Sequence, residues 1–262
     1  MSYPLIDPVI FELGPLQVRW YGLMYVLGFV CAYAILVYLS TRRKGFFRMD
    51  RGEIEDLLLY CIIGLLVGAR LGYCFFYNPG YYLAHPLQVF AVWEGGMSFH
   101  GGVIGLVLVG AAYSRMNKKS FLMLADMAAV AAPPGIFFGR IGNFINGELY
   151  GRITDVPWAM VFPGGGPYPR HPSQLYEAFL EGLLLFAVLF VLSMKVRMQG
   201  ALISVFLIGY GLARFFVEFF REPDPHIGFV LGSLTMGQVL SLFMVAAGIV
   251  VISVQTLRAR DA

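Results

Sequence analysis

The amino-acid sequence predicts an all-α polytopic membrane protein, because the chain is strongly apolar, contains long hydrophobic segments and carries basic residues mainly between them. Hydrophobic residues make up 58% of the 262 positions, whereas charged residues make up only 13%. Soluble domains have roughly a quarter charged residues. A chain this apolar cannot face water on all sides, so helices that span a bilayer explain the composition better than a large soluble core.

About seven apolar segments are long enough to cross a bilayer as helices, which takes about 20 residues. We expect spans near residues 18–40, 55–77, 98–115, 121–141, 174–194, 201–221 and 236–257. The first lacks a preceding basic region and a small-residue cleavage site, so we expect a retained helix rather than a signal peptide. Residues 143–173, rich in Gly and Pro, predict a small irregular head outside the bilayer. We expect one integral-membrane domain, 1–262.

Basic residues between the spans predict the direction in which each helix crosses the membrane. Lys and Arg follow the first, third, fifth and seventh spans, whereas residues 78–97 contain neither. The basic residues of these loops are Arg42, Arg43, Lys44, Arg48, Arg51, Arg115, Lys118, Lys119, Lys195, Arg197, Arg258 and Arg260. Because cytoplasmic loops are enriched in Lys and Arg, we expect the N-terminus outside and the C-terminus in the cytoplasm. Basic residues placed beside spans do not indicate a nucleic acid partner.

This topology gathers the remaining polar residues at one depth, in the outer half of the membrane. They are Tyr21 and His100 early in inward-running spans, Arg70, Arg140 and Arg214 late in outward-running spans, and Gln174, Glu177 and Glu181 at the start of the fifth span. Ionisable groups inside a bilayer cost about 2.5–3.5 kcal/mol each on insertion scales, so they normally pair inside the bundle. Snorkelling to the interface is the alternative for a single Arg near a helix end, but it does not account for the whole group.

The sixth span places four polar residues on one helical face. Tyr210, Arg214, Glu218 and Arg221 are spaced at i, i+4, i+8 and i+11, which aligns them at 3.6 residues per turn. Glu218 is therefore expected to pair with Arg214 and Arg221. One interpretation is a structural ion pair between helices. The other is an arginine held ready for a phosphate group, which its planar fork of donors suits.

The end of the fourth span combines glycine with polar side chains. Residues 139–152 read GRIGNFINGELYGR and contain Gly139, Arg140, Gly142, Asn143, Asn146, Gly147, Glu148 and Gly151. Upstream, Pro133, Pro134 and Gly135 predict a broken or kinked helix, which membranes tolerate only where protein or water lines the backbone. Glycine packing between helices is the alternative, but packing alone does not require Arg, two Asn and Glu at the same point.

His100 opens the third span within the sequence GGMSFHGG, residues 95–102. Because histidine titrates close to neutral pH, it is a candidate proton acceptor. The alternative is a hydrogen-bonded structural histidine in an otherwise apolar helix.

A metal site and a disulfide are not expected. His85 and His226 lie in outer loops without clustered carboxylates. Cys31, Cys61 and Cys74 all fall inside apolar runs without ligand spacing, so they are expected to be buried free thiols.

Several motifs together resemble the bacterial prolipoprotein diacylglyceryl transferases from end to end. They are IDPVIF at 6–11, RWYGLMY at 19–25, GGMSFHGG at 95–102, the 139–152 signature, RHPSQLYE at 170–177, GYGLARFFVEFFR at 209–221 and MGQ at 236–238. The 139–152 signature is highly specific to that family, whereas an isolated HGG would be weak. The stretch that separates it from RHPSQ is shorter than in some members.

The resemblance implies transfer of the diacylglyceryl group from phosphatidylglycerol to the lipobox cysteine of a prolipoprotein signal peptide, without a cofactor. It implies a monomer in the bacterial inner membrane, with the active site toward the periplasm. Matching motif positions make Arg140 and Arg214 the essential arginines. They place further important positions at Tyr21, His100, Asn143, Glu148, Gly151 and Glu218. For phosphatidylglycerol, the expected binding residues are Arg140, Asn143, Gly151, Tyr210, Arg214 and Glu218.

The implied reaction suits arginine, because a phosphate ester leaves with growing negative charge while a thiol attacks. Arginine does not deprotonate in proteins, so it cannot accept the thiol proton. His100 is the first candidate for that base, and Tyr21 and Glu148 are the alternatives. Two other functions stay open from the residues alone. An anionic-phospholipid transporter or flippase would use a similar anion site, and a non-catalytic scaffold subunit would not need so many arginines.

Overall fold

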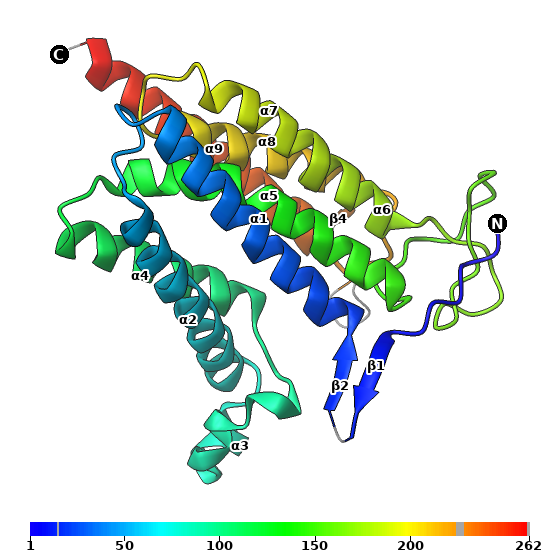
Figure 1. Cartoon of the computed structure of the whole chain (residues 1–262). Coiled ribbons are helices and arrows are strands. Elements are labelled where there is room, and N and C mark those ends of the chain that lie inside the picture. Colours follow the sequence, from blue (N-terminus) through cyan, green and yellow to red (C-terminus); the bar gives the residue numbers. More distant parts are fainter. Residues whose placement is uncertain (15, 224–227, 261–262) are drawn as a thin grey trace. The chain divides into compact units, whose positions relative to one another are not determined.

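The computed structural model describes residues 1–14, 16–223 and 228–260, and most of these residues lie in helices (Figure 1). Six helical segments among them are long and apolar enough to cross a bilayer, namely α1 (Trp20–Arg42), α2 (Arg51–Phe76), α4 (Phe99–Met116), α5 (Phe121–Ile145), the segment Ser173–Ser193 and α9 (Met236–Arg260). A shorter apolar helix, α8 (Ala201–Val217), has 17 residues. The predicted all-α polytopic membrane fold is confirmed, and these segments correspond to the seven expected spans.

The remaining elements are short. The segment Ser173–Ser193 consists of α6 (Ser173–Glu177), the π-helical segment η3 (Ala178–Leu184) and α7 (Leu185–Ser193). Between α2 and α4 lie α3 (Pro79–Ala84), η1 (Pro86–Phe90) and η2 (Val92–Glu94). Two antiparallel hairpins, β1 (Val9–Leu13) with β2 (Leu16–Arg19) and β3 (Phe229–Leu231) with β4 (Leu234–Thr235), lead directly into α1 and α9.

The chain forms two compact units. The first contains Met1–Leu39 and Asp126–Ala262, and the second contains Ser40–Ala125. The first unit therefore includes most of α1 and α5 together with α6–α9, whereas α2, α3 and α4 belong to the second.

In the second unit, glycines bring α2 and α4 into direct backbone contact. Gly64, Gly68 and Gly72 on α2 face Gly101 and Gly105 on α4. A Cβ atom at Gly68 would lie only 2.9 Å from the Cα of Gly105, and one at Gly72 would lie 2.7 Å from the Cα of Gly101. Small residues spaced by four are typical of membrane helix interfaces. The glycines that follow His100 therefore pack α4 against α2.

Arg70 organises the loop that joins α2 to α4. Its side chain is buried, and its guanidinium donates hydrogen bonds of 2.5–3.2 Å to the backbone carbonyls of Gln88, Val89, Ala91, Gly95 and Gly96. Buried carbonyls need such partners, because an unsatisfied polar group is destabilising. Arg70 therefore holds the backbone of 88–96 in place, a role that its position in the sequence did not predict.

The fourth span was expected to be broken or kinked. It is not broken, because α5 runs without interruption from Phe121 to Ile145 with Pro133 and Pro134 inside it, whereas a kink stays a prediction. On its α1 side, a Cβ atom at Gly28 would lie 3.1 Å from the Cα of Gly135. Close packing against a neighbouring helix is one of the ways in which membrane helices accommodate proline.

The predicted head after α5 is irregular but tied down by the N-terminal segment, which lies beside it in Figure 1. Tyr3 is buried, and its hydroxyl donates to the carbonyls of Phe144 and Ile145 at 2.5 and 2.8 Å. Its ring contacts Phe144 and Phe162, with centroids 5.4 and 5.1 Å away. Phe162 is fully buried and also stacks on Tyr150. The head therefore has a small aromatic core of its own.

Asp126, for which the sequence suggested no role, caps α8 from another helix. The backbone N–H groups of Gly200 and Ile203 donate to its carboxylate at 2.7 and 2.8 Å. Gly200, the N-cap residue, has a φ of 88° and offers no side chain of its own. Helix N-termini leave N–H groups without intrahelical partners and attract negative charge. The fully buried Asp126 meets both needs, and it thereby joins α5 to the start of α8.

Replacing Asp126 by Asn should lower stability by about 1–3 kcal/mol, because one buried N–H of α8 would lose its acceptor. Thermal unfolding of the purified protein in detergent measures this effect. Asp155→Asn in the exposed part of the head is the matched control and should leave the transition unchanged. Equal melting temperatures for both variants would show that the cap contributes nothing.

Candidate active site

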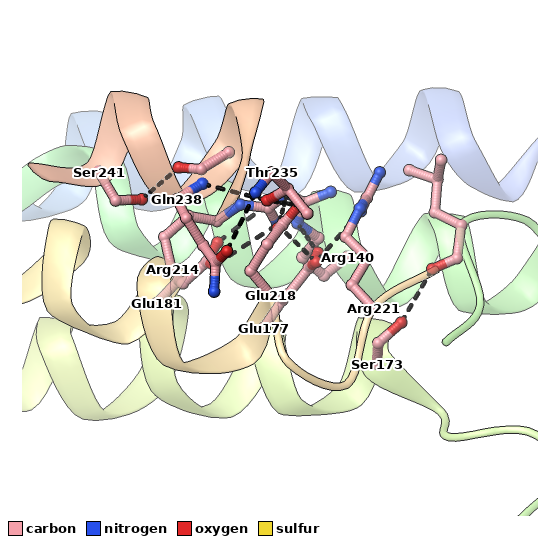
Figure 2. Close-up of polar contacts among 12 residues, drawn as sticks. Arg140, Ser173, Glu177, Glu181, Arg214, Glu218, Arg221, Thr235, Gln238 and Ser241 are labelled. Atoms are coloured by element: carbon pink, nitrogen blue, oxygen red, sulfur yellow. Dashed lines mark hydrogen bonds and ion pairs between the residues drawn. The ribbon is translucent and has the colours of Figure 1, made fainter. Parts of the chain in front are cut away.

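A cluster of charged side chains lies between α5, α6, η3 and α8 of the first unit (Figure 2). We call it the charge cluster, and its members are Arg140, Glu177, Glu181, Arg214, Glu218 and Arg221. Arg140 comes from the last turns of α5, and the glutamates at 177 and 181 come from the start of the fifth span. The other three follow one another along α8 and the turn after it. Three guanidinium groups thus face three carboxylates.

Glu177 is the centre of the charge cluster. Its side chain is fully buried. One carboxylate oxygen pairs with the Nε of Arg140 at 2.6 Å, and the other pairs with the Nη1 of Arg214 at 2.6 Å and of Arg221 at 3.2 Å. One carboxylate therefore joins α5, α6 and the end of α8. Removing one partner from a buried ion pair costs about 3–5 kcal/mol, so Glu177 fixes all three arginines in place.

Glu218 holds Arg214 from the opposite side. Its carboxylate pairs with the Nη2 of Arg214 at 2.7 Å, which confirms the expected i, i+4 pair, and it accepts a hydrogen bond from the Oγ1 of Thr235 at 3.1 Å. Arg221, the other expected partner, pairs with Glu177. Thr235 and Gln238 bond to each other's backbone N–H groups in the manner of a capping box at the start of α9. The MGQ motif at 236–238 therefore supports the charge cluster.

Gly237 supplies the space that Glu218 occupies. A Cβ atom at Gly237 would lie 2.8 Å from a carboxylate oxygen of Glu218. The middle residue of the MGQ motif must therefore be small.

The π-helical segment η3 carries Glu181 and packs closely against α5. Its Gly182 lies against Phe137, where a Cβ atom would come within 2.6 Å of the phenylalanine side chain. Short π-helical segments occur frequently at functional sites. Glu181 within this segment and Glu177 directly before it both face Arg140 and Arg214.

The arginines of the charge cluster are more accessible than its central glutamates. The side chains of Arg140 and Arg214 are 20% and 15% exposed, whereas those of Glu177 and Glu181 are completely buried. Among the described residues, the Nη1 of Arg140 has no hydrogen-bond or ion-pair partner. An approaching anion would therefore meet guanidinium donors already held in position, which is the arrangement that binds phosphate well.

Two tyrosines on α1 lie beside the end of α5. Tyr21 packs on Gly142, where a Cβ atom would come within 2.9 Å of the tyrosine ring. The hydroxyl groups of Tyr21 and Tyr25 are 3.3 Å apart. Tyr25 lies close enough to interact electrostatically with Arg140 and Glu148. The sequence analysis selected Tyr21 but missed Tyr25, although the i, i+4 spacing places both on one helical face.

Asn143 and Glu148 form a second polar group directly after Arg140. The side-chain amides of Asn143 and Asn146 donate to the same carboxylate oxygen of Glu148 at 2.8 and 3.1 Å. Gln174 donates to the backbone carbonyl of Glu148 at 2.6 Å. Gly147, with a φ of 67°, makes the turn that brings these groups together. Asn143 is buried and Glu148 is exposed, so the amide positions an accessible carboxylate.

Gly151 joins the head to the end of α8 through its backbone. Its N–H donates to the carbonyl of His171 at 2.8 Å, and it forms an antiparallel bridge with Arg221. A Cβ atom there would lie 2.7 Å from that of His171 and would also overlap the carbonyl of Phe220. The next residue, Arg152, donates from its Nε to the carbonyl of Arg221 at 2.9 Å. The close approach of Gly151 to His171 and Phe220 explains why position 151 needs glycine. The expected role of Gly151 in lipid binding stays a prediction.

His171 is the last of three aromatic side chains that are linked by hydrogen bonds. Trp158 donates from its indole N–H to the Tyr176 hydroxyl at 2.6 Å, and that hydroxyl lies 3.1 Å from the Nδ1 of His171. Burial lowers the pKa of His171 below its usual 6.5, because it disfavours the charged imidazolium. The neutral ring can therefore accept a hydrogen bond from the Tyr176 hydroxyl at Nδ1. These residues line an apolar groove of about 390 Å³ together with Phe179, Phe216 and Phe220.

His100 lies in the second unit, on the first turn of α4, where Ser98 caps the helix by accepting a hydrogen bond from Gly101. Its side chain is exposed and contacts the ring of Phe99 edge to face. Its role as a base stays a prediction. No group of three metal-ligating side chains occurs in the part of the chain that the structure describes, and His226 lies outside it.

Sequence comparison decides the family. A sequence model described as prolipoprotein diacylglyceryl transferase matches residues 8–254. The chain belongs to this family. It is 54% identical over 249 residues to the phosphatidylglycerol–prolipoprotein diacylglyceryl transferase of Geobacter sulfurreducens, with 95% of each chain covered. It is 51% identical over 258 residues to the protein of the same name from Methylocella silvestris, with 97% of this chain and 95% of that one covered.

The structure thus brings together Arg140, Arg214 and Glu218, as the sequence predicted. The hub of their ion pairs, Glu177, was not among the selected site residues. The signal that could have found it is its place in the fifth span: a carboxylate in an apolar helix needs a cationic partner.

Replacing Gly151 by Ala should reduce both stability and transferase activity, because the added methyl group would push the head away from Phe220. Heat stability in detergent and turnover should fall together. Gly80→Ala is the control, since a Cβ atom at Gly80 meets nothing within 4 Å. A variant that keeps full stability but fails to bind lipid would instead support the predicted contact of Gly151 with lipid.

Proposed function

We propose that the protein transfers the diacylglyceryl group of phosphatidylglycerol to the thiol of the lipobox cysteine in a prolipoprotein signal peptide. The products are a thioether on the peptide and free glycerol phosphate. The observation that carries this proposal is the pair of Arg140 and Arg214, which Glu177 holds together while guanidinium donors stay accessible. The names of the related proteins support the same substrates.

Each bond change in this reaction has a chemical requirement that the chain can meet. The cysteine sulfur forms a bond to the glyceryl carbon as the bond from that carbon to the phosphate oxygen breaks. The leaving phosphate gains negative charge, which Arg140 and Arg214 are placed to stabilise, because preorganised donors need no rearrangement during the reaction. The chain itself needs no reactive cysteine, since the nucleophile arrives on the peptide.

The thiol must lose its proton, because the thiolate is the reacting form. His100 is our first choice for the acceptor, and Tyr21 and Glu148 are the alternatives. Glu148 is exposed and positioned by two amides, and Tyr21 lies against α5 next to the site. No cofactor or metal enters this scheme.

The protein is a multi-pass membrane protein, and we place it in the bacterial inner membrane as a monomer with its active site toward the periplasm. The distribution of Lys and Arg supports this orientation, because the loops expected in the cytoplasm carry them and 78–97 does not.

Replacing Arg140 or Arg214 by Ala should lower transfer by at least about 100-fold, the usual effect of removing one donor that stabilises transition-state charge. The assay follows labelled phosphatidylglycerol onto a lipobox peptide in proteoliposomes. Arg258→Ala near the C-terminal end of α9 is the control and should keep full activity. Near-normal turnover in either site variant would refute the role of the arginines, and lipid movement between leaflets without peptide modification would identify a flippase.

Replacing His100 by Gln should lower turnover about 10²- to 10⁴-fold if the imidazole takes the thiol proton, the usual contribution of a general base. The comparison variants are Tyr21→Phe and Glu148→Gln, assayed with the same peptide. If His100→Gln retains most activity, the histidine is structural, and the larger loss among the other two identifies the base.

A further inference from the structure

The charge cluster is electrically balanced before any ligand binds. It contains three arginines and three glutamates, and its central members are largely or fully buried. A phosphodiester would add one negative charge to this balanced group. In a low-dielectric interior an uncompensated charge is strongly disfavoured. Binding of the anion therefore requires either the loss of a carboxylate charge or the entry of a positive one.

Glu181 is the carboxylate held most loosely. Its closest ion-pair contacts are the Nη2 of Arg140 at 3.8 Å and the Nη1 of Arg214 at 3.9 Å, whereas Glu177 contacts the same arginines at 2.6 Å. Among the described residues, neither oxygen of Glu181 accepts a hydrogen bond of normal geometry, although the side chain is fully buried and Tyr210 lies close to it. A buried ionised carboxylate normally accepts several hydrogen bonds. The negative charge of Glu181 is therefore stabilised less by close contacts than that of the other glutamates in the charge cluster.

The charged and titratable groups that face Glu181 come from three elements. They are Arg140 on α5, Glu177 on α6, and Tyr210 and Arg214 on α8. The two arginines favour the ionised carboxylate, and the neighbouring Glu177 opposes it. An anion bound to the arginines would take up part of their positive charge and add a second negative neighbour. Both changes favour protonation of Glu181 over that of Glu177, which keeps three close arginine contacts.

We propose that Glu181 takes up a proton when the phosphodiester of phosphatidylglycerol binds to Arg140 and Arg214, which keeps the charge cluster neutral. The inference rests on the proposed function, since it assigns the anion to this cluster. Glu181 is then a positioning residue, because it acts through the two arginines and need not touch the lipid. The proton comes from the solvent, so an O–H bond forms on the carboxyl group as the bond between the proton and a hydronium ion or buffer acid breaks.

The sign of the pH dependence follows from the proton uptake. If binding takes up one proton, affinity decreases as the pH rises, by tenfold for each unit once free Glu181 is ionised. Glutamine at this position mimics the protonated form permanently. Glu181→Gln should therefore bind at high pH as tightly as the wild type binds at low pH, with a flat profile.

Calorimetric titration of the full-length protein in detergent with short-chain phosphatidylglycerol measures the uptake. Titrations at one pH in two buffers of different ionisation enthalpy give the number of protons taken up per lipid bound. We expect about one proton for the wild type at about pH 8–9, where free Glu181 is ionised, and none for Glu181→Gln. Glu181→Asp keeps a titratable group and should retain the uptake. The matched control is Glu222→Gln, whose carboxylate pairs with Arg170 in the head at 3.0 Å and should not change it.

Lipid binding without proton uptake in the wild type would overturn the inference, as would unchanged uptake in Glu181→Gln. The wild-type measurement alone decides the first point even if a variant fails to fold. Failure of the proposed function gives a different result, since a wild type that neither binds phosphatidylglycerol nor modifies the peptide has no lipid-linked proton to count. A protein that transfers lipid normally with no proton uptake would refute only the role of Glu181.

Discussion

The carboxylate of Glu177 is the interaction on which the site depends. It is the meeting point of Arg140 from α5, Arg214 from α8 and Arg221 beyond it. Three guanidinium groups so close together would repel one another in a bilayer without this shared anion. The ion pairs of Glu177 therefore have two effects: they join the helices of the first unit, and they hold the arginines in the positions that the reaction needs.

The surroundings of that contact are built to keep it rigid. Gly182 allows η3 to lie against α5, Gly237 leaves room for Glu218, and Gly151 lets the head meet the end of α8. In each case the glycine lets two backbones or a backbone and a charged group approach closely. In the 139–152 signature, for which the sequence offered two explanations, Gly142 and Gly151 allow close packing that places polar groups, whereas a Cβ atom at Gly139 would meet nothing within 4 Å.

The sequence allowed the spans and the Arg214–Glu218 pair to be predicted, because both follow from local patterns: hydrophobic length, and a spacing of four on one helix. The central role of Glu177 could not be predicted in the same way, because it arises from contacts among three segments far apart in the chain. The roles of Asp126 and Arg70 could not be predicted for a related reason. Their partners are backbone N–H and carbonyl groups, which every residue carries and which no sequence motif marks. The prolines of α5 did not break the helix, because tertiary packing outweighs local propensity.

The loop held by Arg70 differs from the charge cluster in the partners of its arginine, which are peptide carbonyls instead of carboxylates. Its guanidinium is bound by five peptide carbonyls, and peptide carbonyls do not take up protons in the range in which bacteria live. A clamp of this kind keeps its strength when the surrounding medium turns acidic, whereas a clamp made with a carboxylate would weaken. The connection between α2 and α4 is thus anchored by a contact that acidity does not loosen.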